Sequence, residues 1–139
     1  MANLLRAFPA VYLLLNALVY LALAWLFVQA PRDWFERLGV VLQDANGYTE
    51  LRSMYIGLMA SLGLFFLLAV LLKNWRTPAL SLALISYTAL GLVRAWGLYG
   101  DGLGNDLMQQ LLLTEIISVL LAALALYCQR LNGRRLGNP

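Results

Sequence analysis

Four stretches of about twenty mostly apolar residues decide what this chain can fold into. They cover about residues 8–30, 52–72, 77–99 and 107–128. Each is long enough to cross roughly 30 Å of hydrocarbon as an α-helix, in which every backbone N–H and C=O finds its partner within the segment. The sequence therefore predicts an all-α fold, a four-helix transmembrane bundle.

The composition excludes the common soluble classes of protein. Of the 139 residues, 62% are hydrophobic and only 12% are charged, about half the charged fraction of a typical soluble domain. The chain has no histidine, the commonest general base and metal ligand, and its single cysteine, Cys128, cannot by itself form a metal site. We therefore predict a single membrane domain over residues 1–139, with no metal and no cofactor.

The charged residues outside the apolar stretches are sorted into two groups. Six bases accompany the two termini and the second loop: Arg6, Lys73, Arg76, Arg130, Arg134 and Arg135. The other two loops hold six acidic residues and only three bases: Asp33, Glu36, Asp44, Glu50, Asp101, Asp106, Arg32, Arg37 and Arg52. Short loops rich in Lys and Arg remain cytoplasmic. Both termini, including a basic tail at 129–139, are thus predicted to lie in the cytoplasm.

The net charge of +3 does not indicate nucleic-acid binding. The bases lie at the ends of apolar stretches, where they contact lipid headgroups, and no soluble surface is available to form a basic face. We expect the lipid bilayer, and no nucleic acid, as a partner.

The loop after the first span contains a second helical pattern. Trp34, Leu38, Val41 and Leu42 recur at helical spacing, while charged residues occupy the other faces. This pattern predicts a short helix lying in the membrane interface. The pair Asn46-Gly47 then predicts a tight turn before the second span.

Two charged residues, Arg94 and Glu115, lie inside the predicted spans. A charge at membrane depth costs at least ~2.5–3.5 kcal/mol, so such residues are functional candidates. At 1.5 Å per residue, Arg94 lies ~9 Å below Gly100 at the outer end of the third span, and Glu115 lies ~12 Å below Leu107 at the outer end of the fourth. We therefore predict an ion pair in the outer half of the bundle, facing its interior.

Other polar side chains are expected close to this pair. Tyr87, Arg94 and Asp101 are spaced by seven and share one face of the third span. Arg52 and Tyr55, three residues apart, begin the second span from the outer side. The candidate ligand-binding residues are Arg52, Tyr55, Tyr87, Arg94, Asp101 and Glu115.

Two further patterns concern helix packing. The polar residues Tyr12, Asn16 and Tyr20 recur every four residues in the first span, nearer its cytoplasmic end, and are not expected to join the outer cluster. Two pairs of small residues are also spaced by four: Gly57 with Ser61, and Gly91 with Ala95. Such pairs are typical of close helix contacts, within the chain or in a homodimer.

Three functions remain open for the charged pair. It can have a purely structural role, which is to fix the register of the helices. It can form a binding site for a lipid headgroup, a quinone or another amphiphile, or for a larger membrane complex. In that site Arg94 and Arg52 would hold an anionic or carbonyl group. Tyr55 and Tyr87 would line the pocket, and Glu115 would orient Arg94. It can also serve a membrane enzyme or proton-coupled carrier with Glu115 as the titrating group. We favour a non-enzymatic binding protein, because no nucleophile with its base and no phosphate loop accompanies Glu115.

Several of these residues form an ordered pattern along the chain. They are Glu50-Leu51-Arg52-Ser53-Met54-Tyr55-Ile56-Gly57, Gly91-Leu92-Val93-Arg94, Gly97, Asp101-Gly102 and Glu115. This pattern resembles a family of small bacterial membrane proteins catalogued as domain of unknown function 4345, similar in general shape to the DoxX-like four-span proteins. The resemblance covers most of the chain from Glu50 onward. It implies the four-span fold and a location in a bacterial inner membrane. It also highlights Arg52, Arg94, Asp101 and Glu115, but it implies no reaction.

Overall fold

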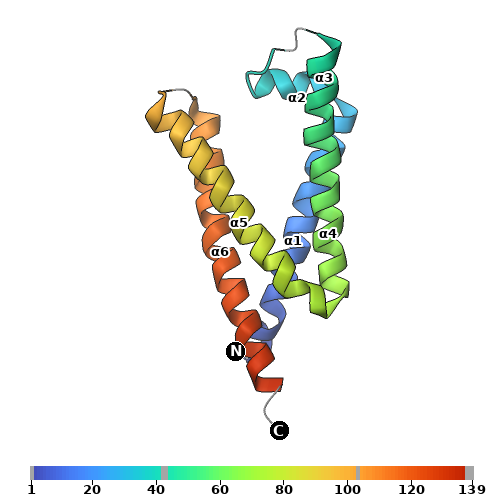
Figure 1. Ribbon diagram of the computed structural model, residues 1–139, viewed down its shortest axis with the longest axis vertical. Coiled ribbons are helices and arrows are strands. Elements are labelled where there is room, and N and C mark those ends of the chain that lie inside the picture. Colours follow the sequence, from blue (N-terminus) through green and yellow to red (C-terminus); the bar gives the residue numbers. More distant parts are fainter. Residues whose placement is uncertain (1, 42–43, 103, 137–139) are drawn as a thin grey trace.

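A computed structural model describes residues 2–41, 44–102 and 104–136, which are almost entirely helical and contain no strand (Figure 1). The elements are α1 (Ala2–Gln29), α2 (Pro31–Arg37), α3 (Ala45–Arg52), the π-helix η1 (Ser53–Leu58), α4 (Met59–Leu71), the 3₁₀-helix η2 (Lys73–Trp75), α5 (Arg76–Ala95), the π-helix η3 (Trp96–Gly100) and α6 (Asp106–Leu136). The predicted all-α fold is confirmed.

Four helical stretches are long and apolar enough to cross a membrane. They are Leu5–Gln29, Ala45–Leu71, Lys73–Gly100 and Asp106–Asn132. Their number and order agree with the four predicted spans, so the chain has the architecture of a multi-pass membrane protein. The N-terminal and C-terminal ends lie at one end of the bundle together with η2, and α2 and α3 lie at the other (Figure 1). We call the latter the outer end.

The second span begins earlier in the chain than its apolar residues indicated. Asp44 caps α3, because its side-chain Oδ1 accepts a hydrogen bond from the Gly47 N–H at 2.7 Å. A capping carboxylate satisfies one of the free N–H groups of a first helical turn. The predicted tight turn at Asn46-Gly47 is therefore wrong, since both residues lie in the first turn of α3.

The last helix also exceeds its predicted length. Helix α6 continues beyond Cys128 to Leu136, through most of the segment expected as a basic tail. Residues 137–139 lie outside the described part of the chain.

The predicted helix in the first outer loop exists as α2, but its packed face differs from the prediction. Gly39 has a positive φ of 75°, and the Gly39 N–H donates to the Glu36 carbonyl at 2.9 Å, which ends the helix early. Val41, expected on the apolar stripe, is 81% exposed, and Leu42 lies outside the described residues. Phe35, which is not on that stripe, is the residue that is fully buried, at 0% exposure.

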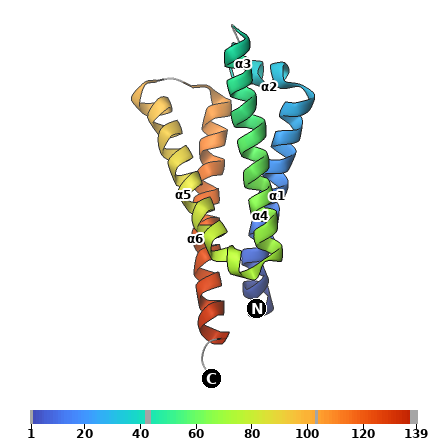
Figure 2. The same ribbon diagram turned by 45° about the vertical axis from the view of Figure 1, so that its right-hand side comes forward.

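The shared core of the four spans lies toward the end that carries the termini. Its buried residues are Tyr12, Leu13, Ala17, Tyr20, Phe66, Ala69, Ala79, Leu80, Ala83, Ala122, Ala125 and Leu126. From this core toward the outer end, the α1–α4 pair and the α5–α6 pair diverge, which gives the molecule a V shape (Figures 1 and 2). The two helix pairs therefore share less packing in the outer half than in the inner half.

Close packing between α1 and α4 depends on Gly63. A Cβ atom on Gly63 would lie only 2.7 Å from Leu21 Cγ and 3.2 Å from the Ala17 carbonyl oxygen. Gly57, predicted to allow a close helix contact, has no atom within 4 Å of such a Cβ. Sequence spacing therefore correctly indicated that a glycine in the second span makes a close helix contact, but it selected Gly57 instead of Gly63.

Candidate functional site

Arg94 and Glu115 form an ion pair between α5 and α6. The Arg94 Nη2 lies 2.7 Å from Glu115 Oε1, and Arg94 Nε donates to Oε1 and Oε2, each at 3.0 Å. The carboxylate thus accepts one edge of the planar guanidinium, a geometry that only arginine can provide. The predicted ion pair is confirmed, and it is the only ion pair in the described residues.

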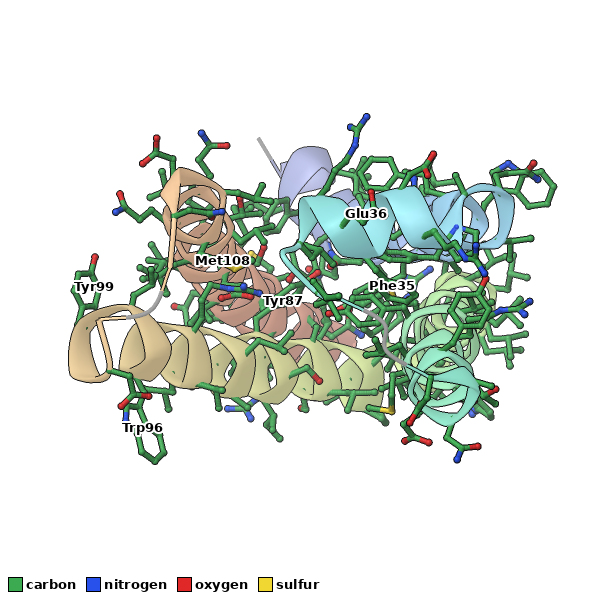
Figure 3. All side chains as sticks on the ribbon, turned by 90° about the horizontal axis from the view of Figure 1, so that it is seen from above. Phe35, Glu36, Tyr87, Trp96, Tyr99 and Met108 are labelled. Carbon is green, nitrogen blue, oxygen red and sulfur yellow. The ribbon has the colours of Figure 1, made fainter. Side chains whose placement is uncertain are left out.

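The neighbours of the pair hold the guanidinium in place. Gly91 lies one helical turn before Arg94, and a Cβ there would lie 3.7 Å from Glu115 Cβ, so the two helices contact each other beside the carboxylate. Arg94 Nη1 donates to the thioether sulfur of Met108 at 3.1 Å, a weak acceptor. Met108 on α6 lies toward the space between the helix pairs (Figure 3).

The two members of the pair are unequally exposed. The side chain of Glu115 is 8% exposed and that of Arg94 is 24% exposed. A guanidinium carries five N–H groups. One at Nε, one at Nη1 and one at Nη2 have acceptors, which leaves two N–H groups without an acceptor among the described residues. The pair is therefore electrically neutral, but it retains unused donors on its more exposed partner.

A second polar group lies where the two helix pairs meet. The Tyr87 hydroxyl donates to Asn16 Oδ1 at 2.6 Å, and Asn16 Nδ2 donates to the Tyr12 carbonyl oxygen at 2.8 Å. The Tyr12 hydroxyl donates to the Ser118 carbonyl oxygen at 3.1 Å. These bonds connect α1 to both α5 and α6, and Tyr87 points between the pairs in Figure 3.

The polar stripe of the first span is thus linked to a predicted site residue, which sequence reasoning did not expect. Tyr87 lies seven residues before Arg94, or ~10 Å deeper along the helix. At that depth it reaches Asn16, and its ring centroid lies 6.3 Å from that of Tyr20. The regular spacing of Tyr12, Asn16 and Tyr20 was the signal that could have indicated a polar face directed into the bundle.

Arg52, Tyr55 and Asp101 are not brought to the ion pair. The Arg52 guanidinium carbon lies 5.4 Å from the ring centroid of Tyr48, next to it in the second span. The Tyr55 ring packs 4.7 Å from Phe27 and is part of the contact that holds α2. Asp101 is exposed in the turn after η3. The divergence of the helix pairs separates α3 and η1 from the outer end of α5, so the six candidates do not form one cluster (Figure 1).

A separate open pocket of about 770 Å³ lies at the outer end. Its lining comes from α2, α3 and the segment between them: Arg32, Glu36, Val40, Val41, Asp44, Ala45 and Tyr48. None of the predicted site residues lines it. The described residues also contain no group of three His, Cys, Asp or Glu side chains that could hold a metal ion.

Comparisons with known proteins give one positive result. Neither the curated proteins nor the solved structures contain a match to the chain. A family model described as Domain of unknown function (DUF4345) matches residues 9–126, which include Asn16, Tyr87, Arg94 and Glu115. The match begins well before Glu50, where the resemblance in sequence began, and it covers all four spans. The chain therefore belongs to the family described as Domain of unknown function (DUF4345).

Proposed function

We propose that the protein is a non-enzymatic accessory protein of the membrane that binds an amphiphile through Arg94 in the outer half of the bundle. One observation carries this proposal: Glu115 holds one edge of the guanidinium, while the Arg94 side chain remains 24% exposed and keeps two N–H groups without an acceptor in the described residues. A purely structural pair would gain from complete burial and complete hydrogen bonding. The unused donors favour a site for a further acceptor.

The position of the pair favours an amphiphile as the source of that acceptor. Both residues belong to helical stretches apolar and long enough to cross a membrane, and a donor at membrane depth without a partner costs free energy. An amphiphile can bring a polar oxygen to this level while its chains remain in the hydrocarbon. Because the helix pairs diverge outward (Figure 2), such a molecule would enter between them from the outer half.

The alternative function, an enzyme or proton-coupled carrier that uses Glu115, has less support. Both oxygens of that carboxylate accept hydrogen bonds from Arg94, so the carboxylate is engaged by the guanidinium instead of being presented to a substrate. The hydroxyl of Ser118, one turn further along α6, donates to the Thr114 carbonyl oxygen. The geometry therefore supports a binding role for Glu115, that of orienting Arg94.

Bound amphiphile is expected to accompany the wild-type protein through gentle detergent extraction, and native mass spectrometry will detect it as an added mass. The paired variant Arg94→Gln/Glu115→Gln replaces the guanidinium by a shorter, uncharged amide with fewer donors and leaves no unpaired charge. It should therefore fold, and the occupancy of the ligand should fall at least about tenfold. Arg37→Gln is the matched control. It removes an exposed outer arginine whose guanidinium carbon lies 5.0 Å from the ring centroid of Trp34, and it should retain the ligand.

Equal occupancy in the wild-type protein and in the paired variant would remove Arg94 from this function. The same spectra report subunits. A homodimer would appear at twice the mass of the chain, and a larger membrane complex would appear as the chain with the added mass of another protein.

We also propose that both termini are cytoplasmic and that the membrane is the bacterial inner membrane. The start of α1, η2 and the last turns of α6, which carry Arg6, Lys73 and Arg130, lie at the end with the termini, and the turn after η3, which carries Asp101, lies at the other (Figure 1). This distribution agrees with the preference of Lys and Arg for cytoplasmic loops. A membrane-impermeant thiol reagent on spheroplasts should label a cysteine introduced at Asp101 and spare one at Lys73. The native Cys128 is 3% exposed and should give a low background. If only the cysteine introduced at Lys73 is labelled, the proposed orientation is wrong and both termini face outward.

A further inference from the structure

We infer that the Arg94 site takes an uncharged headgroup, through a carbonyl or ester oxygen, in preference to a phosphate or carboxylate. This inference rests on the proposed function and names the ligand class of the same site. It goes beyond the sequence, in which an anionic group and a carbonyl group were equally compatible with arginine.

The first argument is the charge of the site. Glu115 is 6% exposed and accepts three hydrogen bonds from Arg94, so the positive charge is already balanced by a buried negative one. No other ion pair occurs in the described residues, and Arg52 does not add a second positive charge to the site, because it stacks on Tyr48 on the other helix pair. A ligand anion beside Arg94 would therefore meet a second anion across one guanidinium, in surroundings of low dielectric constant where like charges repel strongly.

The second argument is the number of donors. Arg94 offers two N–H groups without acceptors in the described residues, and one carbonyl oxygen with two lone pairs can accept both. The Tyr87 hydroxyl, two turns earlier on the same face of α5, already donates to Asn16 Oδ1 at 2.6 Å. A phosphate has more acceptor positions than these residues can satisfy, so part of its hydration would be lost without replacement.

The third argument is depth. Arg94 lies six residues before Gly100, where η3 ends, which corresponds to ~9 Å along the helix. The headgroup region of one leaflet is only about 5–8 Å thick. With Gly100 at the outer surface of the membrane, the backbone of Arg94 would lie at or below the level at which phospholipid headgroups give way to ester carbonyls and hydrocarbon. A small uncharged headgroup can sink to this depth more readily than a phosphate.

A competition between two defined lipids tests the inference. Purified protein in a neutral detergent is given equal amounts of dioleoylglycerol and dioleoylphosphatidylglycerol, and the bound masses are measured by native mass spectrometry. The wild-type protein should bind dioleoylglycerol with at least about fivefold higher occupancy. Glu115→Gln keeps an acceptor for Arg94 but removes the balancing charge, so the ratio should shift toward dioleoylphosphatidylglycerol by at least about tenfold.

The possible outcomes separate this inference from the proposed function. A wild-type preference for dioleoylphosphatidylglycerol that disappears in the paired variant Arg94→Gln/Glu115→Gln would overturn the uncharged headgroup and leave Arg94 as a binding residue. An unchanged lipid ratio in folded Glu115→Gln would also overturn it. If neither lipid binds more to the wild-type protein than to the paired variant, the proposed function itself fails. Where Glu115→Gln does not yield folded protein, the wild-type ratio decides.

Discussion

Replacement of Arg94 by leucine is expected to lower the free energy of unfolding by about 3 kcal/mol. The change leaves Glu115, which is 6% exposed, without the guanidinium that donates all three of its side-chain hydrogen bonds. A buried charge without its partner is more costly than the absence of the whole pair. Unfolding of the purified protein in mixed micelles, followed by circular dichroism, measures the loss.

Two further variants show whether this loss comes from the pair. Glu115→Gln should cost only about 1–2 kcal/mol, because its amide oxygen still accepts from Arg94 and the arginine is the more exposed partner. The paired variant Arg94→Gln/Glu115→Gln should lie within about 1 kcal/mol of the wild-type protein, since no charge remains unpaired. The effects of the single substitutions would then be strongly non-additive. If Arg94→Leu is as stable as the wild-type protein, Glu115 does not depend on Arg94 in the folded state.

Gly63→Val is expected to destabilise the protein by about 2 kcal/mol and to loosen the α1–α4 pair. The added Cβ would lie 2.7 Å from Leu21 Cγ and 3.2 Å from the Ala17 carbonyl oxygen. A leucine side chain can rotate away from such a contact, but the backbone oxygen on α1 moves only with its helix. The valine methyl groups add to the overlap. The same unfolding measurement in mixed micelles reports this change.

Gly57→Val is the matched control for this prediction. It lies in η1, six residues earlier in the same span, and nothing lies within 4 Å of an added Cβ. Its effect on the free energy of unfolding should stay within about 0.5 kcal/mol. Equal destabilisation by the two substitutions would mean that the α1–α4 contact is not centred on Gly63.

The spans and the ion pair could be predicted because both follow from the free-energy cost of placing polar groups in hydrocarbon. That cost can be read from the position of each residue along its own helix. A helix that crosses a bilayer needs about 20 apolar residues, and two opposite charges at similar depth on consecutive antiparallel helices have a strong reason to meet. The level of Arg94 and Glu115 could be calculated from the rise per residue alone. These arguments needed no knowledge of how the remaining helices pack.

The membership of the wider site could not be predicted because it depends on the angle between the helix pairs. Arg52 at the end of α3 and Tyr55 in η1 lie in the outer part of the second span, but the divergence of the pairs carries α3 and η1 away from the outer end of α5 (Figure 1). Tyr87 lies deeper, where the two helix pairs are still in contact, and its hydroxyl donates a hydrogen bond to Asn16 on α1. The angle between the helix pairs is a property of their packing against each other, and spacing along one helix does not encode it.

Local errors have local causes. Two helices have bounds that differ by several residues from the predicted ones. Helix α3 begins early because Asp44 caps it, and α2 ends early because Gly39 adopts a positive φ. Both features are single-residue events that hydrophobic periodicity does not detect. Phe35 packs between Phe27 and Tyr55, with ring centroids 5.1 Å and 5.3 Å away, and these contacts hold α2 at the outer end.

An experimental structure of the wild-type protein in a lipid bilayer that contains dioleoylglycerol tests the central claim most directly, since the claim is that Arg94 offers free donors between two diverging helix pairs. We predict that the pairs remain apart at the level of Arg94, with an elongated amphiphile between them whose oxygen lies about 3 Å from Nη1 or Nη2. A structure in which α4 closes against α5 over a dry Arg94–Glu115 pair would contradict the account, and the pair would then serve only to hold the helices in register.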